Sequence, residues 1–179
     1  MNPERLICIT AVCLIINAVG CAPTRPPVIE EVYPVTRVEE IDTETRQRVE
    51  HILGRIRTAS REKTLENLGR STMSESVALM DMGDRIAPIL IQELKSGSNW
   101  KFRFWLVDML GFVGGYGNIL PLVEVIEDNS EREKVRLRAC ESIKELRLPE
   151  AVRYLLVSRE IVSNPRVKAE IQKAIDFLR

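Results

Sequence analysis

The chain has 179 residues, enough for one domain of ordinary size with short appendages. It carries 26 basic and 26 acidic residues, and this neutrality argues against a nucleic-acid-binding protein, which normally needs a basic excess. A single histidine excludes a multi-histidine metal site, and four scattered cysteines are too few for a disulfide scaffold. We therefore expect a globular protein without a metal or other cofactor.

The segment from Leu6 to Val19 is almost entirely apolar. As a helix rising about 1.5 Å per residue it would span about 21 Å, short of the hydrocarbon core of a bilayer, which is about 30 Å thick. This length is typical of the hydrophobic region of a secretory signal. Residues 1–20 are therefore predicted to be a signal peptide.

The residues Val19-Gly20-Cys21 match the end of a lipobox, so the segment resembles a bacterial lipoprotein signal. The resemblance implies that Cys21 receives a diacylglycerol, becomes the first residue after cleavage, and is acylated on its new amine. Each buried CH₂ contributes about 0.8 kcal/mol, so two or three acyl chains would hold the protein firmly on a membrane. The alternative is an ordinary signal peptide or an uncleaved anchor in which Cys21 has no role.

The resemblance also implies a location in the bacterial cell envelope, facing the periplasm or the exterior. Ala22 follows the cysteine, so the aspartate that retains lipoproteins in the inner membrane is missing. The outer membrane is therefore the expected destination if the host has one.

Residues 21–42 are predicted to be an extended linker. They contain four of the nine prolines, namely Pro23, Pro26, Pro27 and Pro34. Proline fixes φ and lacks a backbone donor, so the stretch favours polyproline II over helix. At about 3.1 Å per residue it could hold a domain up to about 65 Å from a membrane.

From residue 43 onward the apolar residues follow a helical period. Apolar or small residues recur at offsets of 0, 4, 7, 8 and 11 in segments that begin at Gly69, Phe102, Val135 and Val167, 32 or 33 residues apart. These offsets form one face of an α-helix. A second set of apolar segments, with a proline near the start, lies between them. The sequence therefore predicts alternating helices of two types.

This pattern resembles the HEAT and HEAT-like repeat families, in which a proline-led helix is followed by a helix reading V-R-x-x-A-x-x-A-L. The segment VRLRACESIKEL at 135–146 carries the resemblance best. It implies an all-α fold over residues 43–179, a short α-solenoid of helix pairs in which each pair buries its apolar face against its neighbours.

A basic residue recurs directly after the first position of each copy of the pattern. In one interpretation these residues form a basic stripe for an acidic partner. In the other, which we favour, they form a structural ladder with neighbouring carboxylates or helix C-termini. The four residues are Arg70, Arg103, Arg136 and Lys168.

The sequence offers no candidate catalytic residues, so we expect no enzyme activity. The paired glutamates of the linker lie where no burial can tune a pKa for acid–base chemistry, and His51 has no matching nucleophile. The glycine-rich segment 111–117 lacks the Gly-Lys-Ser/Thr end of a phosphate loop and is expected to follow a helix. Cys140 lies on an apolar helical face and is expected to be buried.

The segment 99–113 is unusually aromatic. A helix that is apolar nearly all round is either covered by its neighbours or presents an apolar patch, and aromatic side chains are typical anchors of binding surfaces. We favour a structural role and keep four residues as partner-binding candidates: Trp100, Phe104, Trp105 and Phe112.

Taken together, the sequence favours a lipid-anchored envelope protein that acts as a protein–protein interaction scaffold or assembly factor. Its expected partners are the membrane, through the lipid, and an unidentified protein or a second copy of itself. Two alternatives remain: a lyase-like or accessory enzyme subunit, as occurs among HEAT-like relatives, and a self-associating structural component of the envelope.

Overall fold

The structure is a computed structural model and describes residues 41–97 and 99–179. The described residues all belong to one compact unit. The predicted signal peptide, Cys21 and nearly all of the predicted linker lie outside the described residues. Within the described ranges the chain is all-helical and has no strand, which confirms the predicted all-α class.

Nine α-helices and two short 3₁₀ turns make up this part of the chain. In order they are α1 (Thr43–Glu62), α2 (Leu65–Ser71), α3 (Met73–Met80), η1 (Gly83–Ile86), α4 (Ala87–Lys95), α5 (Trp100–Val113), η2 (Tyr116–Asn118), α6 (Ile119–Glu127), α7 (Glu133–Leu146), α8 (Ala151–Ile161) and α9 (Pro165–Leu178). No helix within these ranges combines the length and the apolar character that crossing a bilayer requires.

Polar side chains fix where several helices begin. Asp42 accepts a hydrogen bond from the Thr45 backbone N–H at 2.8 Å, and Thr64 caps α2 in the same way. Asn99 and Asn164 each accept two backbone N–H bonds at the starts of α5 and α9. These caps satisfy donors that have no partner inside a helix.

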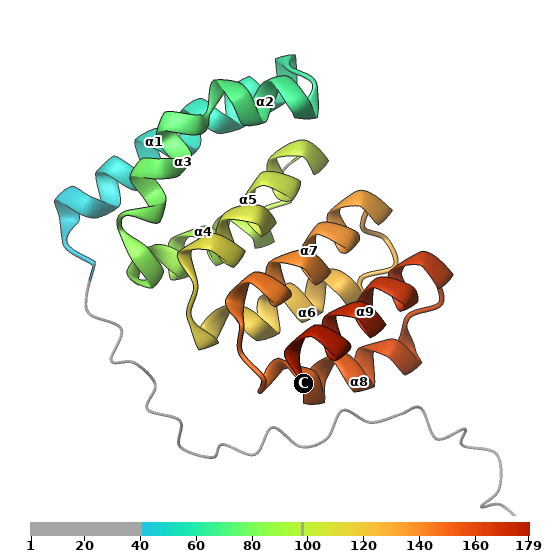
Figure 1. Ribbon diagram of the computed structural model, residues 1–179. Helices are drawn as coiled ribbons and strands as arrows, with labels where there is room; N and C mark the ends of the chain where they lie inside the picture. The colour runs from blue at the N-terminus through green and yellow to red at the C-terminus, as the bar shows by residue number, and fades with distance from the viewer. Residues whose placement is uncertain (1–40, 98) are drawn as a thin grey trace, which may run out of the picture. The chain divides into compact units, whose positions relative to one another are not determined.

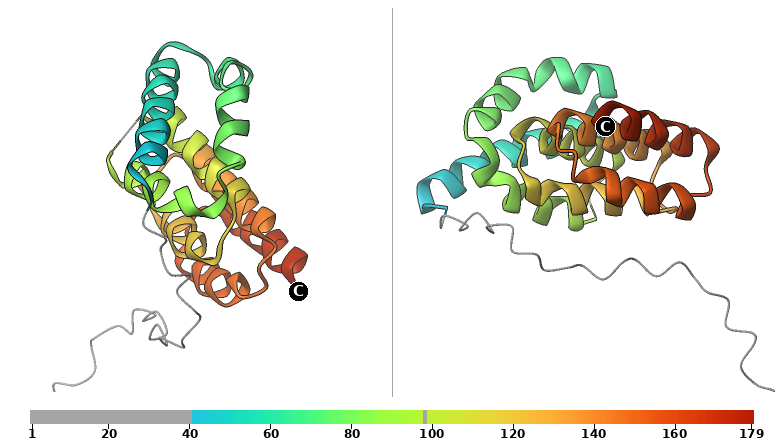
Figure 2. Two further views of the ribbon diagram at one scale, coloured as in Figure 1. Left: turned by 90° about the vertical axis from the view of Figure 1, so that its left-hand side faces the viewer. Right: turned by 60° about the horizontal axis from the view of Figure 1, so that its bottom comes forward.

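The helices from α4 onward lie in two layers (Figures 1 and 2). The helices α5, α7 and α9 lie side by side in one layer, and α4, α6 and α8 belong to the other. Consecutive helices from the two layers, α4–α5, α6–α7 and α8–α9, pack against each other as pairs. The last three copies of the repeat pattern therefore lie on the second helices of three consecutive pairs, namely α5, α7 and α9.

One core runs between the layers. The first residues of the last three copies, Phe102, Val135 and Val167, are fully buried. The later members of these copies are also buried, including Leu106, Ile143 and Ile171, except Leu146, which is half-buried. The predicted core face is confirmed there. Cys140 is buried as well, as expected.

The predicted apolar face of the first copy was wrong. Met73 and Val77 are 67% and 46% exposed, whereas the fully buried residues of this segment include Leu68 and Leu79. The predicted single helix is broken at Thr72, whose φ of −113° and ψ of 15° leave the helical range. The Thr72 hydroxyl donates to the Leu68 carbonyl at 2.9 Å, and the Thr72 backbone N–H donates to the same carbonyl at 3.0 Å. The buried residues Leu68, Thr72, Glu75 and Leu79 keep helical spacing on both sides of Thr72, so the buried face lies one residue before the predicted face along the whole segment.

Candidate interaction surface

Trp105 belongs to the core rather than to the surface. Its side chain is 4% exposed, and its ring stacks on that of Phe102 with centroids 6.2 Å apart. Its indole N–H donates to the Ser76 hydroxyl on α3 at 3.3 Å. Trp105 therefore covers the junction between α3 and α5.

The other three aromatic candidates lie in different environments. Trp100 is half-buried beneath the Arg132 guanidinium, 5.1 Å from its ring centroid, and Phe104 is half-buried against the core. Phe112 is 49% exposed in the last turn of α5. The structure thus does not bring the four candidates together in one patch, and only Phe112 is exposed.

A second exposed phenylalanine lies on the same helical layer and was missed from the sequence. Phe177, in the last turn of α9, is 60% exposed. It follows Phe112 by two repeat intervals, and Glu145 on α7 occupies the equivalent position between them. The repeat register could have revealed this, because Phe112 and Phe177 each lie ten residues after the start of their copy.

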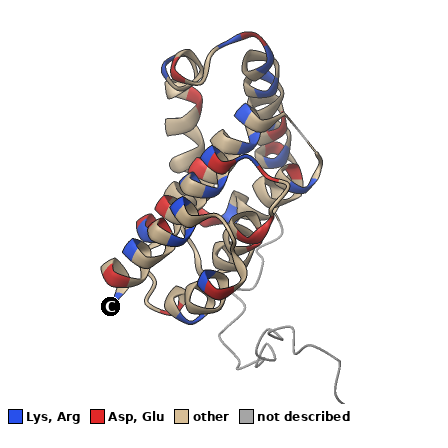
Figure 3. Cartoon of the chain, turned by 90° about the vertical axis from the view of Figure 1, so that its right-hand side faces the viewer, with Lys and Arg blue, Asp and Glu red and all other residues tan. Residues whose placement is uncertain are grey.

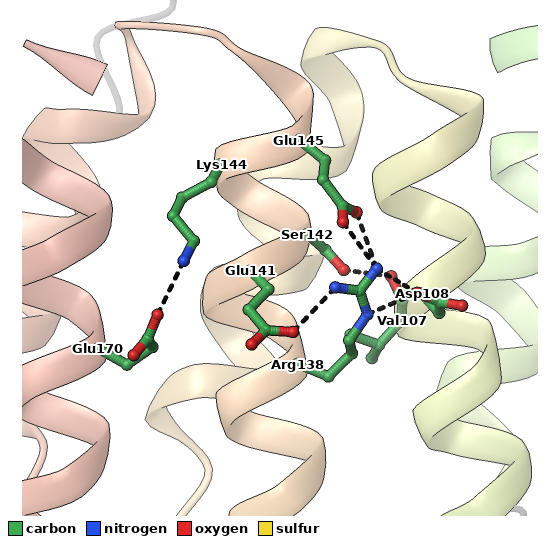
Figure 4. A network of polar contacts seen from close by, with 8 residues as sticks. All are labelled: Val107, Asp108, Arg138, Glu141, Ser142, Lys144, Glu145 and Glu170. Atoms are coloured by element: carbon green, nitrogen blue, oxygen red, sulfur yellow. Dashed lines mark hydrogen bonds and ion pairs between the residues drawn. The ribbon is translucent and has the colours of Figure 1, made fainter. Parts of the chain in front are cut away.

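One arginine on α7, Arg138, binds three carboxylates on α5 and α7 (Figure 4). The Arg138 Nε donates to Asp108 Oδ1 on α5 at 2.5 Å, and the Nη groups donate to Glu141 at 3.0 Å and to Glu145 at 2.9 Å. The guanidinium also lies 5.7 Å from the Phe112 ring centroid, within the range of a cation–π contact. This network joins α5 to α7 and supports one face of an exposed aromatic ring.

The network holds more negative than positive charge, because three carboxylates share one guanidinium. Burial raises the pKa of the Asp108 carboxyl, although Arg138 opposes the shift. Burial would lower the pKa of Arg138, but Asp108 and the two glutamates outweigh it and the pKa is raised. Arg138 therefore stays charged, and the surface between α5 and α7 is acidic.

The surface between α7 and α9 has the opposite balance. Glu170 on α9 accepts a hydrogen bond from Lys144 on α7 at 2.8 Å (Figure 4). It accepts a second one from Lys173 on α9 at 2.9 Å. Burial would raise the pKa of Glu170, but the two ammonium groups outweigh it and lower the pKa. Two ammonium groups therefore share one carboxylate here. On the face turned to the viewer in Figure 3, acidic and basic residues are interleaved along the helices.

Two of the four predicted ladder residues reach the C-terminal ends of helices in the other layer. Arg103 donates to the Leu94 carbonyl in the last turn of α4 and to the Glu131 carboxylate. Arg136 donates from Nε to the Ile126 carbonyl near the end of α6 at 2.8 Å. A cation at this position interacts favourably with the helix dipole.

The other two ladder residues lie in different environments. Arg70 pairs with Glu66 one turn earlier on α2, and both side chains are largely exposed. Lys168 is half-buried on α9. The structure therefore brings only Arg103 and Arg136 into equivalent contacts.

A groove of about 590 Å³ lies between α1 and the segment formed by α2 and α3. Its lining includes His51, which is exposed, and Glu75, whose carboxylate lies 2.7 Å from the Arg55 guanidinium. A hydrogen bond from the Ser74 hydroxyl, assisted by Arg55, lowers the pKa of Glu75. This carboxylate is therefore held ionised and already has partners, so it is poorly placed to act as a general base.

Burial raises the pKa of the Cys140 thiol to about 12. A thiol that stays protonated is a poor nucleophile and a poor metal ligand. In the described ranges, no group of three or more histidine, cysteine or acidic side chains could hold a metal ion.

No protein-family model matches the chain, and a search of curated proteins found no match.

Proposed function

We propose that the chain is a lipoprotein of the bacterial cell envelope whose helical domain binds another protein as an interaction scaffold or assembly factor. The domain would be a short α-solenoid of HEAT-like pairs. The observation that carries the binding role is the exposure of Phe112 and Phe177 at equivalent positions on one helical layer.

Contacts that recur with the sequence interval support the solenoid. The pairs α4–α5, α6–α7 and α8–α9 pack internally, and α7 contacts both α5 and α9. Arg103 and Arg136, one interval apart, make similar contacts with the ends of α4 and α6. Such nearest-neighbour packing is the expected behaviour of a repeat protein.

Two exposed phenylalanines on one face support a binding role. Phe112 and Phe177 are 49% and 60% exposed, so a partner that covered the rest of each ring would gain about 1–2 kcal/mol per ring. Aromatic side chains are also enriched among the residues that dominate binding energy.

The sequence from Leu6 to Cys21 supports the lipid anchor, and the absence of an aspartate after Cys21 favours an outer membrane where the host has one. Replacing Cys21 by Ser is expected to abolish labelling by a radioactive or clickable fatty acid and to shift the protein from the membrane to the soluble fraction. Cys13→Ser, in the predicted signal peptide, is the matched control and should keep both properties. A Cys21→Ser variant that stays labelled in the membrane fraction would contradict the anchor.

The binding role can be tested separately in the native envelope. Cross-linking of the lipidated chain, followed by purification and mass spectrometry, is expected to recover one protein at a constant ratio. Its binding to the purified chain should then be measurable with both proteins pure. A chain that cross-links to no protein, or only to itself, would contradict the proposed role.

A further inference from the structure

The layer of α5, α7 and α9 carries an exposed phenylalanine on each of its outer helices. Phe112 on α5 and Phe177 on α9 are the exposed large aromatic side chains of the described residues. Both lie in the last turn of their helices, with α7 between them. Packed helices lie about 8–10 Å apart, so the two rings are separated by about 16–20 Å across the face.

The charges between the two rings are ordered. Next to Phe112, three carboxylates share the single guanidinium of Arg138, which leaves an acidic surface. Between α7 and α9, the ammonium groups of Lys144 and Lys173 share the carboxylate of Glu170, so these three groups carry a net positive charge. Among these ion-paired groups, the α5–α7 surface thus carries an excess of carboxylates and the α7–α9 surface an excess of ammonium groups.

We propose that this face binds an amphipathic helix of a partner protein, which lies across α5, α7 and α9. The inference rests on the proposed function and adds the form of the partner. In a helix, positions i and i+11 lie on one face about 16.5 Å apart, which matches the separation of the two rings. Apolar side chains at these positions contact Phe112 and Phe177.

Charge complementarity determines which residues the partner helix carries between its two apolar positions, i and i+11. Positions i+4 and i+7 share the face of i and i+11. A basic residue at i+4 meets the carboxylates around Arg138, and an acidic residue at i+7 meets Lys144 and Lys173. This order selects the partner and its direction, because like charges placed opposite each other are repelled.

Synthetic peptides of about 18 residues test the proposal against the full chain by isothermal titration calorimetry. All are Ala- and Gln-rich helices with Leu at i and i+11. One carries Lys at i+4 and Glu at i+7, one carries Lys at both positions, and one carries Glu at both. The mixed peptide is expected to bind at least about fivefold more tightly than either of the others. Equal affinities, or no binding of the mixed peptide, would overturn the proposal.

Variants of the chain test which residues bind the peptide. Phe112→Ala and Phe177→Ala are each expected to weaken the mixed peptide about tenfold. Leu120→Ala is the matched control, because Leu120 is 36% exposed but lies on α6 in the other layer. Equal losses in the control and in the phenylalanine variants would show that the face is not the site. Thermal unfolding confirms that each variant is folded.

Lys173→Glu tests the charge order without disturbing the core, because the Lys173 side chain is 69% exposed. This change makes the α7–α9 surface acidic, so the preference should move from the mixed peptide to the peptide with two lysines. An unchanged preference would contradict the charge argument.

Two outcomes separate this inference from the proposed function. A native partner that binds a Phe112→Ala, Phe177→Ala double variant as tightly as the original chain would overturn the inference and leave the proposed function intact. Self-association that depends on both rings would identify a second copy as the occupant, and would also overturn it.

Discussion

Gly111 on α5 lies in close contact with α7. A β-carbon built at this position would lie 2.8 Å from Ser142 Cβ and 2.9 Å from Ser142 Cα on α7. The Ser142 hydroxyl donates to the Val107 carbonyl at 2.9 Å across the same contact. The glycine is therefore required by packing, not by a turn, although sequence inspection placed it at the start of a glycine-rich loop.

Gly111→Ala is expected to lower the free energy of unfolding by about 1–3 kcal/mol, because the two helix backbones must separate. Helix propensity alone would make alanine about 1 kcal/mol more stabilising than glycine. A lower free energy of unfolding in Gly111→Ala would therefore show that the packing between α5 and α7 outweighs this preference. Gly69→Ala on α2 is the matched control: its β-carbon would meet nothing within 4 Å, and it should stabilise the protein. Urea unfolding measures both, and a stabilising Gly111→Ala would contradict the packing argument.

Individual helices are joined by side chains at their ends. Asn99 and Asn164 cap α5 and α9 with Oδ1, and their amide groups donate to Ser60 at 2.7 Å and to Glu133 at 2.9 Å in the neighbouring helices α1 and α7. Each asparagine lies three residues before the first core residue of its copy. These positions fix both the start of a helix and its placement against the preceding pair.

Arg103 and Arg70 occupy equivalent positions in the repeat pattern but lie in different environments. We therefore expect them to contribute differently to the free energy of unfolding. Arg103→Met is expected to lower the free energy of unfolding by about 1–3 kcal/mol, because the Leu94 carbonyl and the 6% exposed Glu131 side chain lose a charged partner. Arg70→Met should change it by about 0.5 kcal/mol at most, because the pair with Glu66 is exposed. Chemical denaturation compares the two, and equal losses would refute this assignment.

The helical class and most of the core could be predicted from the sequence, because they depend on a local period of apolar residues. The displaced face around Thr72 could not, because the match to the repeat pattern at residues 69–80 does not show which of two adjacent positions packs against the neighbouring helices. The Arg138 network depends on a contact between α5 and α7, residues that lie about one repeat apart. Aligning the copies of the repeat pattern would have shown that Phe177 is equivalent to Phe112. The sequence around Phe177 alone does not predict its exposure, because a single phenylalanine near charged residues forms no recognisable pattern.

At the scale of the whole domain, packing is uneven along the chain. The helices α5 and α7 share an extensive interface, whereas α1 and α2–α3 are separated by the groove of about 590 Å³. Regions with few buried apolar contacts open locally at a lower free energy than the global transition. The segment α2–α3 should therefore be the least stable part of the domain.

Amide hydrogen exchange tests whether α2 and α3 are less stable than α5 and α7. Amides in the centres of α2 and α3 should exchange by local opening, with protection at least about tenfold lower than in the centres of α5 and α7. Mild denaturant should accelerate exchange in α5 and α7 far more than in α2 and α3, because only global unfolding exposes the former. Uniform protection across these four helices would indicate a single cooperative unit instead.

The buried side chain of Asn118 has a consequence for the speed of recognition. Its amide donates to the Leu110 carbonyl at 2.8 Å and to the Gly114 carbonyl, and so closes the end of α5 against η2. Phe112 lies between these two acceptors, on backbone that is already immobilised. Docking at that ring would need no slow rearrangement of the chain, and its rate would be limited by diffusion and orientation alone.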